Sequence, residues 1–272
     1  MIWSLGQDTS QVATLKPTKF DFQNCAWSPD GTVLAATTDD STLCLWHTDT
    51  FQLRHRTEGS GRPVIAPHFI VFSPDGRWLA TSQEHQTCRI WDVPSCTLHK
   101  ELHGHTDNLS AAAFDPTSTR IATASDDKTV RLWDVETGEL LFVMEQHTGW
   151  VRDVSFSPDG SLVLSASSDH TVKIWDASDG VMISSLEGHS DRVYAACFSP
   201  CGLYIASASQ DRTMRLWRTS DGSCVRRLTE HEAAVSHITF SPDGKTLSSG
   251  DMDGTVIIRR MVDILPTEQS DM

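Results

Sequence analysis

The segment from Gly104 to Asp134 reads GHTDNLSAAAFDPTSTRIATASDDKTVRLWD, and much of it returns along the chain at a nearly constant interval. The clearest marker is its tryptophan, which recurs after 42 residues at Trp175 and again at Trp217, while the next step falls on Arg259. Going backwards from Trp133, the intervals are 42, 45 and 43 residues, to Trp91, Trp46 and Trp3. A period of about 40–45 residues predicts a repeat array with one propeller blade per repeat.

Each repeat contains short runs that favour β-strands, such as 162–167 and 171–175, bounded by turn residues. The turns read Ser-Pro-Asp-Gly at 28–31, 73–76, 157–160 and 241–244, with the variants Asp-Pro-Thr-Ser at 115–118 and Ser-Pro-Cys-Gly at 199–202. Proline presets φ at the first central position and glycine supplies a positive φ. Such a unit cannot bury both faces of its sheet alone, so neighbouring units must stack on it.

These marks resemble the WD-repeat (WD40) family over nearly all of the chain. The specific residues are the Gly-His pair at 188–189 and the Trp-Asp pairs at 91–92, 133–134 and 175–176. The resemblance implies a hydrogen-bonded tetrad of His, Ser or Thr, Asp and Trp within each blade. Carried over by position, the tetrads are His105, Ser125, Asp127 and Trp133; His147, Ser167, Asp169 and Trp175; and His189, Ser209, Asp211 and Trp217.

A histidine, a serine and an aspartate are also the components of a nucleophilic triad. However, the set recurs at one interval, and each copy includes a tryptophan whose indole N–H needs an acceptor when it is buried. An enzyme needs one such site, so the replication favours an architectural role. We therefore expect no catalytic residues and a protein that is not an enzyme.

The resemblance further implies an all-β WD40 propeller that forms a single domain over residues 1–265, followed by a disordered tail at 266–272. We expect six complete four-stranded blades, with repeats ending near residues 46, 91, 133, 175, 217 and 259, and an N-terminal half-blade whose repeat ends near residue 3. In this seven-bladed arrangement, truncated at the N-terminus, Met261–Leu265 forms the outer strand of the sixth repeat. The alternative is a six-bladed closure in which Gln11–Leu15 takes that place.

Three repeats depart from the tetrad pattern. The first has Thr18 where histidine is expected, and the second has Pro63, Gln83 and His85 at the three positions other than tryptophan. The sixth keeps His231 but has Asp251 for the hydroxyl residue and Arg259 for the tryptophan, which leaves Asp253 as the expected carboxylate. Atypical terminal repeats are expected in an array.

The composition limits the possible partners. The formal charge of −14, from 22 Lys plus Arg against 36 Asp plus Glu, disfavours direct binding to nucleic acid or to anionic membranes. The seven cysteines have no regular spacing, which suits a reducing compartment. The first five residues lack a basic region followed by an apolar stretch, so we expect no signal peptide, and no apolar run reaches membrane-spanning length. We therefore expect a cytoplasmic or nuclear protein.

No cofactor or metal site is expected. A group of cysteines and histidines lies at Cys88, Cys96, His99, His103 and His105, but its spacing matches no tetrahedral zinc pattern. Neither a phosphate-binding P-loop nor a dinucleotide-binding glycine motif is present.

The resemblance implies that partners dock on the narrow face of the propeller, as a peptide or loop of another protein. The positions that the family presents there include residue types enriched at interaction hot spots. The candidate protein-binding residues are Trp150, Arg152, Arg192, Tyr194, Asn108 and Asp126, and an acidic sector of the same face comprises Asp21, Asp39, Glu84 and Asp126.

We therefore expect a non-catalytic scaffold or recognition module for protein–protein interaction. The alternative is a detached C-terminal sensor region of a larger multidomain signalling protein, for example a signalling ATPase. A family fold of this kind does not identify the partner.

Overall fold

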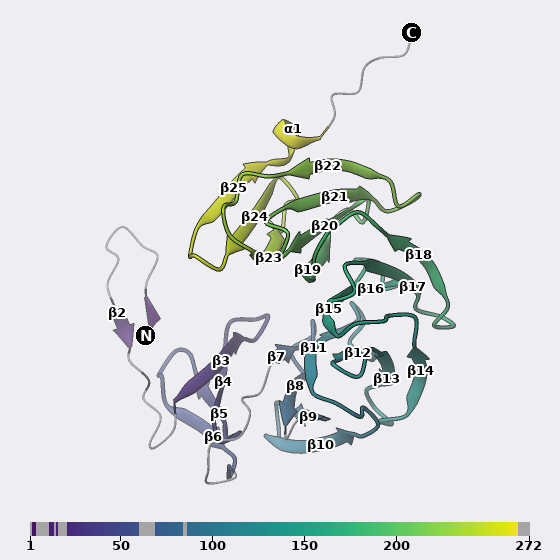
Figure 1. The fold of residues 1–272 in the computed structure, drawn as a ribbon. Helices are drawn as coiled ribbons and strands as arrows, with labels where there is room; N and C mark the ends of the chain where they lie inside the picture. The colour runs from purple at the N-terminus through teal and green to yellow at the C-terminus, as the bar shows by residue number, and fades with distance from the viewer. Residues whose placement is uncertain are drawn as a thin grey trace. The chain divides into compact units, whose positions relative to one another are not determined.

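The computed structural model describes residues 2–3, 11–13, 15, 21–59, 69–83 and 86–265. The chain divides into two compact units, Met1–Glu101 and Leu102–Met272. Both units consist of antiparallel sheets in which consecutive strands pair (Figure 1). The predicted all-β architecture of repeated blade-like sheets is confirmed. Two further points stay predictions: that residues 1–265 form a single domain, and how many blades close the ring.

Unit one contains a two-stranded sheet and two four-stranded sheets. The strands of the two-stranded sheet are β1 (Ile2–Trp3) and β2 (Gln11–Ala13). The first four-stranded sheet comprises β3 (Phe22–Trp27), β4 (Val33–Thr38), β5 (Leu43–His47) and β6 (Leu53–Arg56). The second comprises β7 (Ile70–Phe72), β8 (Trp78–Gln83), β9 (Thr87–Asp92) and β10 (Thr97–Leu102).

Unit two contains three four-stranded sheets and one three-stranded sheet. The first comprises β11 (Leu109–Phe114), β12 (Arg120–Ser125), β13 (Val130–Asp134) and β14 (Leu140–Met144). The second comprises β15 (Val151–Phe156), β16 (Leu162–Ser167), β17 (Val172–Asp176) and β18 (Met182–Leu186). The third comprises β19 (Val193–Phe198), β20 (Tyr204–Ser209), β21 (Met214–Arg218) and β22 (Cys224–Leu228). The last comprises β23 (Val235–Phe240), β24 (Thr246–Asp251) and β25 (Val256–Arg260), followed by the helix α1 (Met261–Ile264).

The hairpin turns follow from their sequence. Between β15 and β16, Gly160 has φ +73° and its N–H donates to Ser157 O at 2.9 Å. The Ser157 hydroxyl donates to Asp159 at 2.6 Å, so the turn is held by side chains as well as backbone. In the variant turn between β11 and β12, Ser118 takes the glycine position and adopts φ +61°, a conformation that is uncommon for a residue with a Cβ atom.

The core of unit two lies between successive sheets. Val130, Leu132 and Met144 of the first sheet are buried against Val151 and Trp175 of the second. Each sheet therefore buries one face against its neighbour, as a repeat array requires.

The segment after β25 corrects one prediction. Met261–Leu265 does not form the outer strand of the last sheet, because Met261–Ile264 is a short helix and the last sheet has three strands in the described residues. Met261 and Ile264 are both buried, and their i, i+3 spacing places them on the same side of a helical turn. Arg226 Nε of β22 donates to Ile264 O at 3.0 Å, which ties this turn to the preceding sheet. No helix in the described part of the chain is long and apolar enough to span a bilayer.

Candidate functional site

Each of the three complete sheets of unit two contains a buried hydrogen-bond chain, that is, a set of four side chains joined one to the next by hydrogen bonds. In the first sheet, His105 Nδ1 lies 2.8 Å from Asp127 Oδ2, and His105 Nε2 lies 2.8 Å from Thr123 Oγ1. Trp133 Nε1 donates to the same hydroxyl at 2.8 Å. The threonine hydroxyl therefore bridges the imidazole and the indole.

The same chain recurs in the next two sheets with nearly identical distances. The bridging hydroxyl belongs to Ser165 in one sheet and to Ser207 in the other. The second chain comprises His147, Asp169, Ser165 and Trp175, and the third comprises His189, Asp211, Ser207 and Trp217.

The predicted hydroxyl residues Ser125, Ser167 and Ser209 are therefore not members of the chains. Ser125 Oγ instead donates to Asp107 O at 3.1 Å and accepts from the Asp127 N–H at 3.0 Å. The ladder explains the shift, because Trp133 pairs with Ile121 and Ser125 lies four residues farther along β12. Four residues of strand span about 13 Å, beyond the reach of an indole, whereas Thr123 is two residues away on the same face.

The last sheet contains an altered chain. His231 contacts Asp251 Oδ2 at 2.8 Å and Ser249 Oγ at 2.7 Å. The carboxylate is therefore Asp251 and not the predicted Asp253, which is exposed. Arg259 takes the tryptophan position, with Nη1 at 3.4 Å from Ser249 Oγ and Nη2 at 2.8 Å from Glu230.

The carboxylates of the hydrogen-bond chains are ionised, and burial holds the histidines of the second and third chains, His147 and His189, neutral by lowering the pKa of each ring. Burial alone would raise the pKa of Asp211, but hydrogen bonds from Thr213, His189 and the Ser190 N–H lower it to about 2. Burial lowers the pKa of His189, against the opposing effect of Asp211. The neutral ring therefore donates from Nδ1 to the carboxylate and accepts at Nε2 from the serine hydroxyl.

This proton arrangement matches a Ser-His-Asp triad, but the burial does not suit catalysis. Ser165 is 0% exposed and the His147 side chain is 0% exposed, so no substrate can approach the hydroxyl. The Ser165 oxygen also accepts from Trp175 Nε1 at 2.8 Å. The chains therefore serve to satisfy buried polar groups between strands.

The predicted face residues lie at one end of the sheets of unit two. In each of the three complete sheets, the pairing of the first strand with the second shifts register at the start of the first strand. The backbone carbonyl of the residue just before the first strand accepts a hydrogen bond from a backbone N–H in the turn that follows the second strand. The donors and acceptors are Asp126 to Asn108 at 2.8 Å, Ser168 to Trp150 at 2.8 Å, and Gln210 to Arg192 at 2.8 Å.

Trp150 and Arg152 form a stacked pair on this face. The Arg152 guanidinium carbon lies 4.5 Å from the centre of the Trp150 ring, and Trp150 is 43% exposed. Arg152 Nε donates to Ser168 Oγ at 3.0 Å, and Nη1 donates to Asp126 of the neighbouring sheet at 3.3 Å. The guanidinium that lies over the ring is therefore itself positioned by two further hydrogen bonds.

Tyr194 and Arg192 present a second group on the adjacent sheet. The Tyr194 hydroxyl donates to Gln210 Oε1 at 2.7 Å. Arg192 is exposed, and within the described residues its side chain has no hydrogen bond or ion pair. Strand β19 of this group is tied to β15 by the Ala196 N–H, which donates to Asp153 Oδ2 at 3.0 Å.

The acidic sector expected on the same face is only partly described. In unit one, the Asp39 N–H donates to Asp21 O at 3.0 Å, the same bond that the face positions of unit two make. Glu84, together with Thr18, Pro63 and His85 of the degraded repeats, lies outside the described residues.

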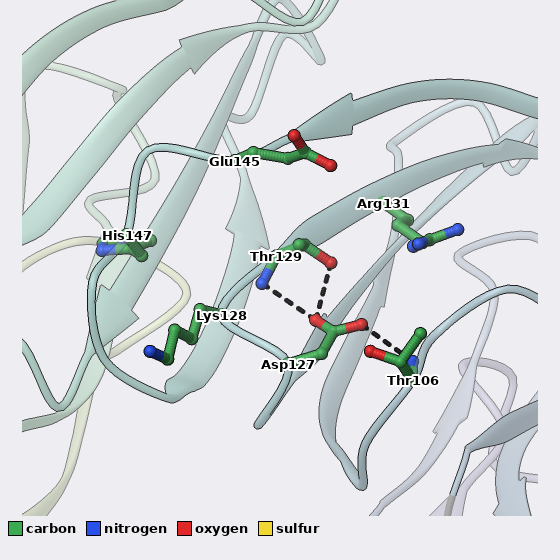
Figure 2. A pocket seen from close by; sticks show the side chains of 7 residues that line it. All are labelled: Thr106, Asp127, Lys128, Thr129, Arg131, Glu145 and His147. Carbon is green, nitrogen blue, oxygen red and sulfur yellow. Dashed lines mark hydrogen bonds between the residues drawn. The ribbon is translucent and has the colours of Figure 1, made fainter.

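A polar pocket of about 390 Å³ lies beside the hydrogen-bond chain that contains Asp127 (Figure 2). This pocket was not predicted from the sequence. Its lining comprises Thr106, Asp127, Lys128, Thr129, Arg131, Glu145 and His147. Thr129 donates to Asp127 through both its N–H and its hydroxyl, at 2.9 and 2.7 Å. Gly104 lies next to this lining, because a Cβ atom added at this position would clash with Arg131 Nη1. The lining contains two cations and two carboxylates, so its charge selects no ligand class.

A family model described as "WD domain, G-beta repeat" matches residues 9–47, 57–92, 96–134, 138–176, 180–218 and 222–259. The COMPASS component SWD3 of Saccharomyces cerevisiae is 27% identical over 107 residues, which is 39% of this chain and 33% of that protein. Human U4/U6 small nuclear ribonucleoprotein Prp4 is 39% identical over 56 residues, 21% of this chain and 10% of that protein. Protein hir1 of Schizosaccharomyces pombe is 28% identical over 88 residues, 32% of this chain and 9% of that protein.

The aligned region thus covers a third or less of each of these relatives. The family model, in contrast, matches most of the chain in six successive segments, each ending at or within one residue of a tryptophan position or of Arg259. The chain belongs to the WD-domain, G-beta (WD40) repeat family.

Proposed function

We propose that this protein is a non-catalytic recognition module that binds a peptide or loop of another protein at the Trp150–Arg192 face. The observation that supports the proposal most is the Trp150–Arg152 pair, a partly exposed aromatic ring with a guanidinium over it, since both residue types are enriched at hot spots. The family consists of WD-repeat proteins, and a named relative is a component of COMPASS, which fits a scaffold role.

The ligand class follows from the charges on this face. Arg152 is already engaged by Asp126 and Ser168, whereas the Arg192 side chain has no hydrogen bond or ion pair in the described residues. An apolar side chain of the ligand would cover Trp150, and an acidic side chain would pair with Arg192. The net charge of −14 disfavours direct binding to nucleic acid.

Affinity capture followed by identification of the bound proteins tests the proposal. The variant with Trp150→Ala and Arg192→Ala should lose the main partner while its melting temperature stays close to that of the wild type. The matched control combines Asp21→Ala and Asp39→Ala and should retain the partner, or bind it more tightly because repulsion is removed. If the control loses the partner and the Trp150/Arg192 variant keeps it, the face has the opposite polarity from the one proposed.

The localisation that suits this function is the cytoplasm or the nucleus. The name of one relative places it in a small nuclear ribonucleoprotein. A role as the sensor region of a larger multidomain signalling protein stays the alternative, since the match covers only a small part of each relative.

A further inference from the structure

Two arginines stand opposite each other on the outer strands of the third sheet of unit two (Figure 1). Arg215 of β21 and Arg227 of β22 are direct partners in the antiparallel ladder, so their side chains leave the sheet on the same face. Like charges directly opposite each other destabilise a sheet. This pair therefore costs stability unless a negative charge joins it.

The preceding repeats do not place two cations at this pair of positions. The residues found there, at successive steps of 42 residues, are Lys173 and Ser185, Arg131 and Val143, and Arg89 and Glu101. Lys173 Nζ donates to Ser185 Oγ at 3.1 Å, and Arg89 Nε lies 2.6 Å from Glu101 Oε1. Where one repeat supplies a carboxylate to its arginine, the third sheet of unit two supplies a second arginine.

Neither arginine has a carboxylate partner in the described residues. Arg215 Nη2 donates to Gly188 O at 2.7 Å and Nη1 to Cys224 Sγ at 3.5 Å, whereas its buried Nε has no hydrogen-bond partner there. Arg227 is exposed, and its side chain makes no hydrogen bond or ion pair in that part of the chain. Both charges reach one imidazole, since burial lowers the pKa of His189 most and the two guanidinium groups lower it further.

A third arginine and the loss of an acidic residue make this region more positive than its counterpart in the first sheet. There, Lys128, Arg131 and Glu145 line one polar pocket (Figure 2). The residues 84 positions later are Arg212, Arg215 and Thr229. Arg212 is exposed, and its side chain has no hydrogen bond or ion pair within the described residues. A carboxylate is thus replaced by a hydroxyl while both cations are kept.

The acidic side chains of this region do not neutralise the arginines. Asp211 Oδ2 lies 2.9 Å from His189 Nδ1, and Glu230 pairs with Arg259 at 2.8 Å. Glu187 precedes Gly188 in the chain, but among the described residues it forms no ion pair with Arg215. A negative charge that pairs with the arginines must therefore come from a ligand.

The ligand class follows from the chemistry of the guanidinium group. Its N–H donors form two parallel hydrogen bonds to the oxygens of a carboxylate or a phosphate. A phosphate monoester carries a charge of about −1.5 to −2 at neutral pH, which matches several arginines better than one carboxylate does.

The position of the arginines indicates the source of the phosphate. Arg212 and Arg227 are exposed, whereas a site for a small free ligand buries most of the ligand. A phosphate carried by a protein gains further contacts from the rest of its carrier. The net charge of −14 disfavours a long polyanion such as nucleic acid.

We propose that Arg212, Arg215 and Arg227 bind a phosphorylated serine or threonine side chain of another protein. The phosphate takes the place beside Arg215 that the Glu101 carboxylate has beside Arg89. The site belongs to β21, β22 and the turn before β21, and it does not depend on the Trp150–Arg192 face, so the two proposals can fail independently.

The probe is an immobilised pool of heptapeptides with phosphoserine at the centre and mixed residues at the other positions. The full chain should be retained about tenfold more strongly than on the same pool with serine at the centre. Equal retention on the two pools would overturn the proposal. Stronger retention on immobilised single-stranded DNA would identify a polyanion as the ligand instead, and release by inorganic phosphate as readily as by the soluble phosphoserine pool would identify the free anion.

Two charge reversals locate the site. Arg227→Glu places a carboxylate opposite Arg215, so it should lower retention on the phosphoserine pool about tenfold without lowering the melting temperature. The matched control is Arg192→Glu, which changes the net charge equally on an exposed residue just before β19 of the same sheet and should leave retention unchanged. Loss of retention in the control but not in Arg227→Glu would place the phosphate on the Trp150–Arg192 face and overturn the proposal.

Discussion

At the scale of single residues, the main result is that each buried chain runs through a hydroxyl two residues before the one that the family pattern suggested. Ser165 contacts both His147 and Trp175, whereas Ser167 contacts the backbone of Gly149 and Asp169. Both serines are fully buried, so their individual substitution costs do not separate the two assignments. The two assignments differ instead in which serine is energetically coupled to Trp175.

A double-mutant cycle measures that coupling. Ser165→Ala and Trp175→Phe should show an interaction energy on the order of 1 kcal/mol in chemical denaturation, because the two side chains share a hydrogen bond. The matched cycle of Ser167→Ala with Trp175→Phe should show additive losses within about 0.5 kcal/mol. Coupling in the second cycle and none in the first would restore the predicted assignment.

A second residue-scale prediction concerns Asp153, which lies on β15. Burial raises the pKa of Asp153 to about 6, although the N–H groups of Ala196 and Val154 donate to it. This carboxylate also helps to raise the pKa of Cys197 to about 12, after the larger effect of burial. The pKa of Asp153 is higher in the folded state than in the unfolded state. Its contribution to the free energy of unfolding is therefore fully present below about pH 4 and is lost as the pH rises through about 6.

Asp153→Asn removes the titrating group and keeps an acceptor for Ala196. The variant should match the wild type near pH 4 and exceed its unfolding free energy by about 1–3 kcal/mol near pH 8. The lower part of that range is favoured because the residue is only half-buried and solvent screens part of the effect. Denaturation curves at several pH values provide the measurement, with the exposed Asp179→Asn as the control. A difference that is constant with pH would contradict the assignment.

At the scale of elements, the variant turn between β11 and β12 links two sheets. Asp115 accepts from Thr119 N at 2.8 Å, from Arg120 N at 3.0 Å and from Arg120 Nε at 3.2 Å. The same guanidinium donates to Gly160 O at 2.9 Å and to Ala177 O at 2.7 Å in the next sheet. This turn lacks the Ser-Pro-Asp-Gly pattern and has instead the buried carboxylate of Asp115, which positions Arg120 so that it bridges the two sheets.

Asp115→Asn should therefore destabilise the protein by about 1.5–3 kcal/mol, since it weakens charged hydrogen bonds to a partly buried arginine. The matched change in the next turn, Asp159→Asn, should cost less than about 1 kcal/mol, because that carboxylate is exposed. Urea denaturation of the two variants gives the comparison. Equal losses would show that Asp115 acts only within its own turn.

The elements also show which features could be predicted from sequence. The strands and turns of unit two follow from the 42-residue period and from the Pro and Gly positions, which act locally. The hydroxyl of each chain could not be chosen by spacing, because Thr123 and Ser125 both face the tryptophan side of β12 and only the ladder distinguishes them. Likewise, Met261–Ile264 has apolar residues that suit either a strand or a helical turn, and the contact with Arg226 is made by a distant part of the chain.

At the scale of the whole molecule, the two compact units differ in their buried polar chains. Unit two has three chains that join histidine, hydroxyl and tryptophan. In the described part of unit one, Trp91 Nε1 donates to Thr81 Oγ1 at 3.1 Å, and the expected histidine positions lie outside that part. Unit one should therefore be the less stable of the two.

Scanning calorimetry should accordingly resolve two transitions. Thr81→Ala should lower only the first melting temperature, and Ser165→Ala should lower only the second. Each shift should be a few degrees for a loss of about 1 kcal/mol. A single transition that both substitutions move together would show that the units unfold as one.

The stacked pair on the candidate face has an optical consequence. Trp133, Trp175 and Trp217 are at most 2% exposed, whereas Trp150 is 43% exposed with a guanidinium 4.5 Å from its ring centre. Among the indoles of unit two, the emission of Trp150 should therefore lie at the longest wavelength. It should also be the one most readily quenched by iodide, because its ring is the one that solvent reaches. A ligand that covers this ring would exclude iodide and shift its emission to shorter wavelength, so the protein carries an intrinsic fluorescent reporter at the surface where we expect its partner to bind.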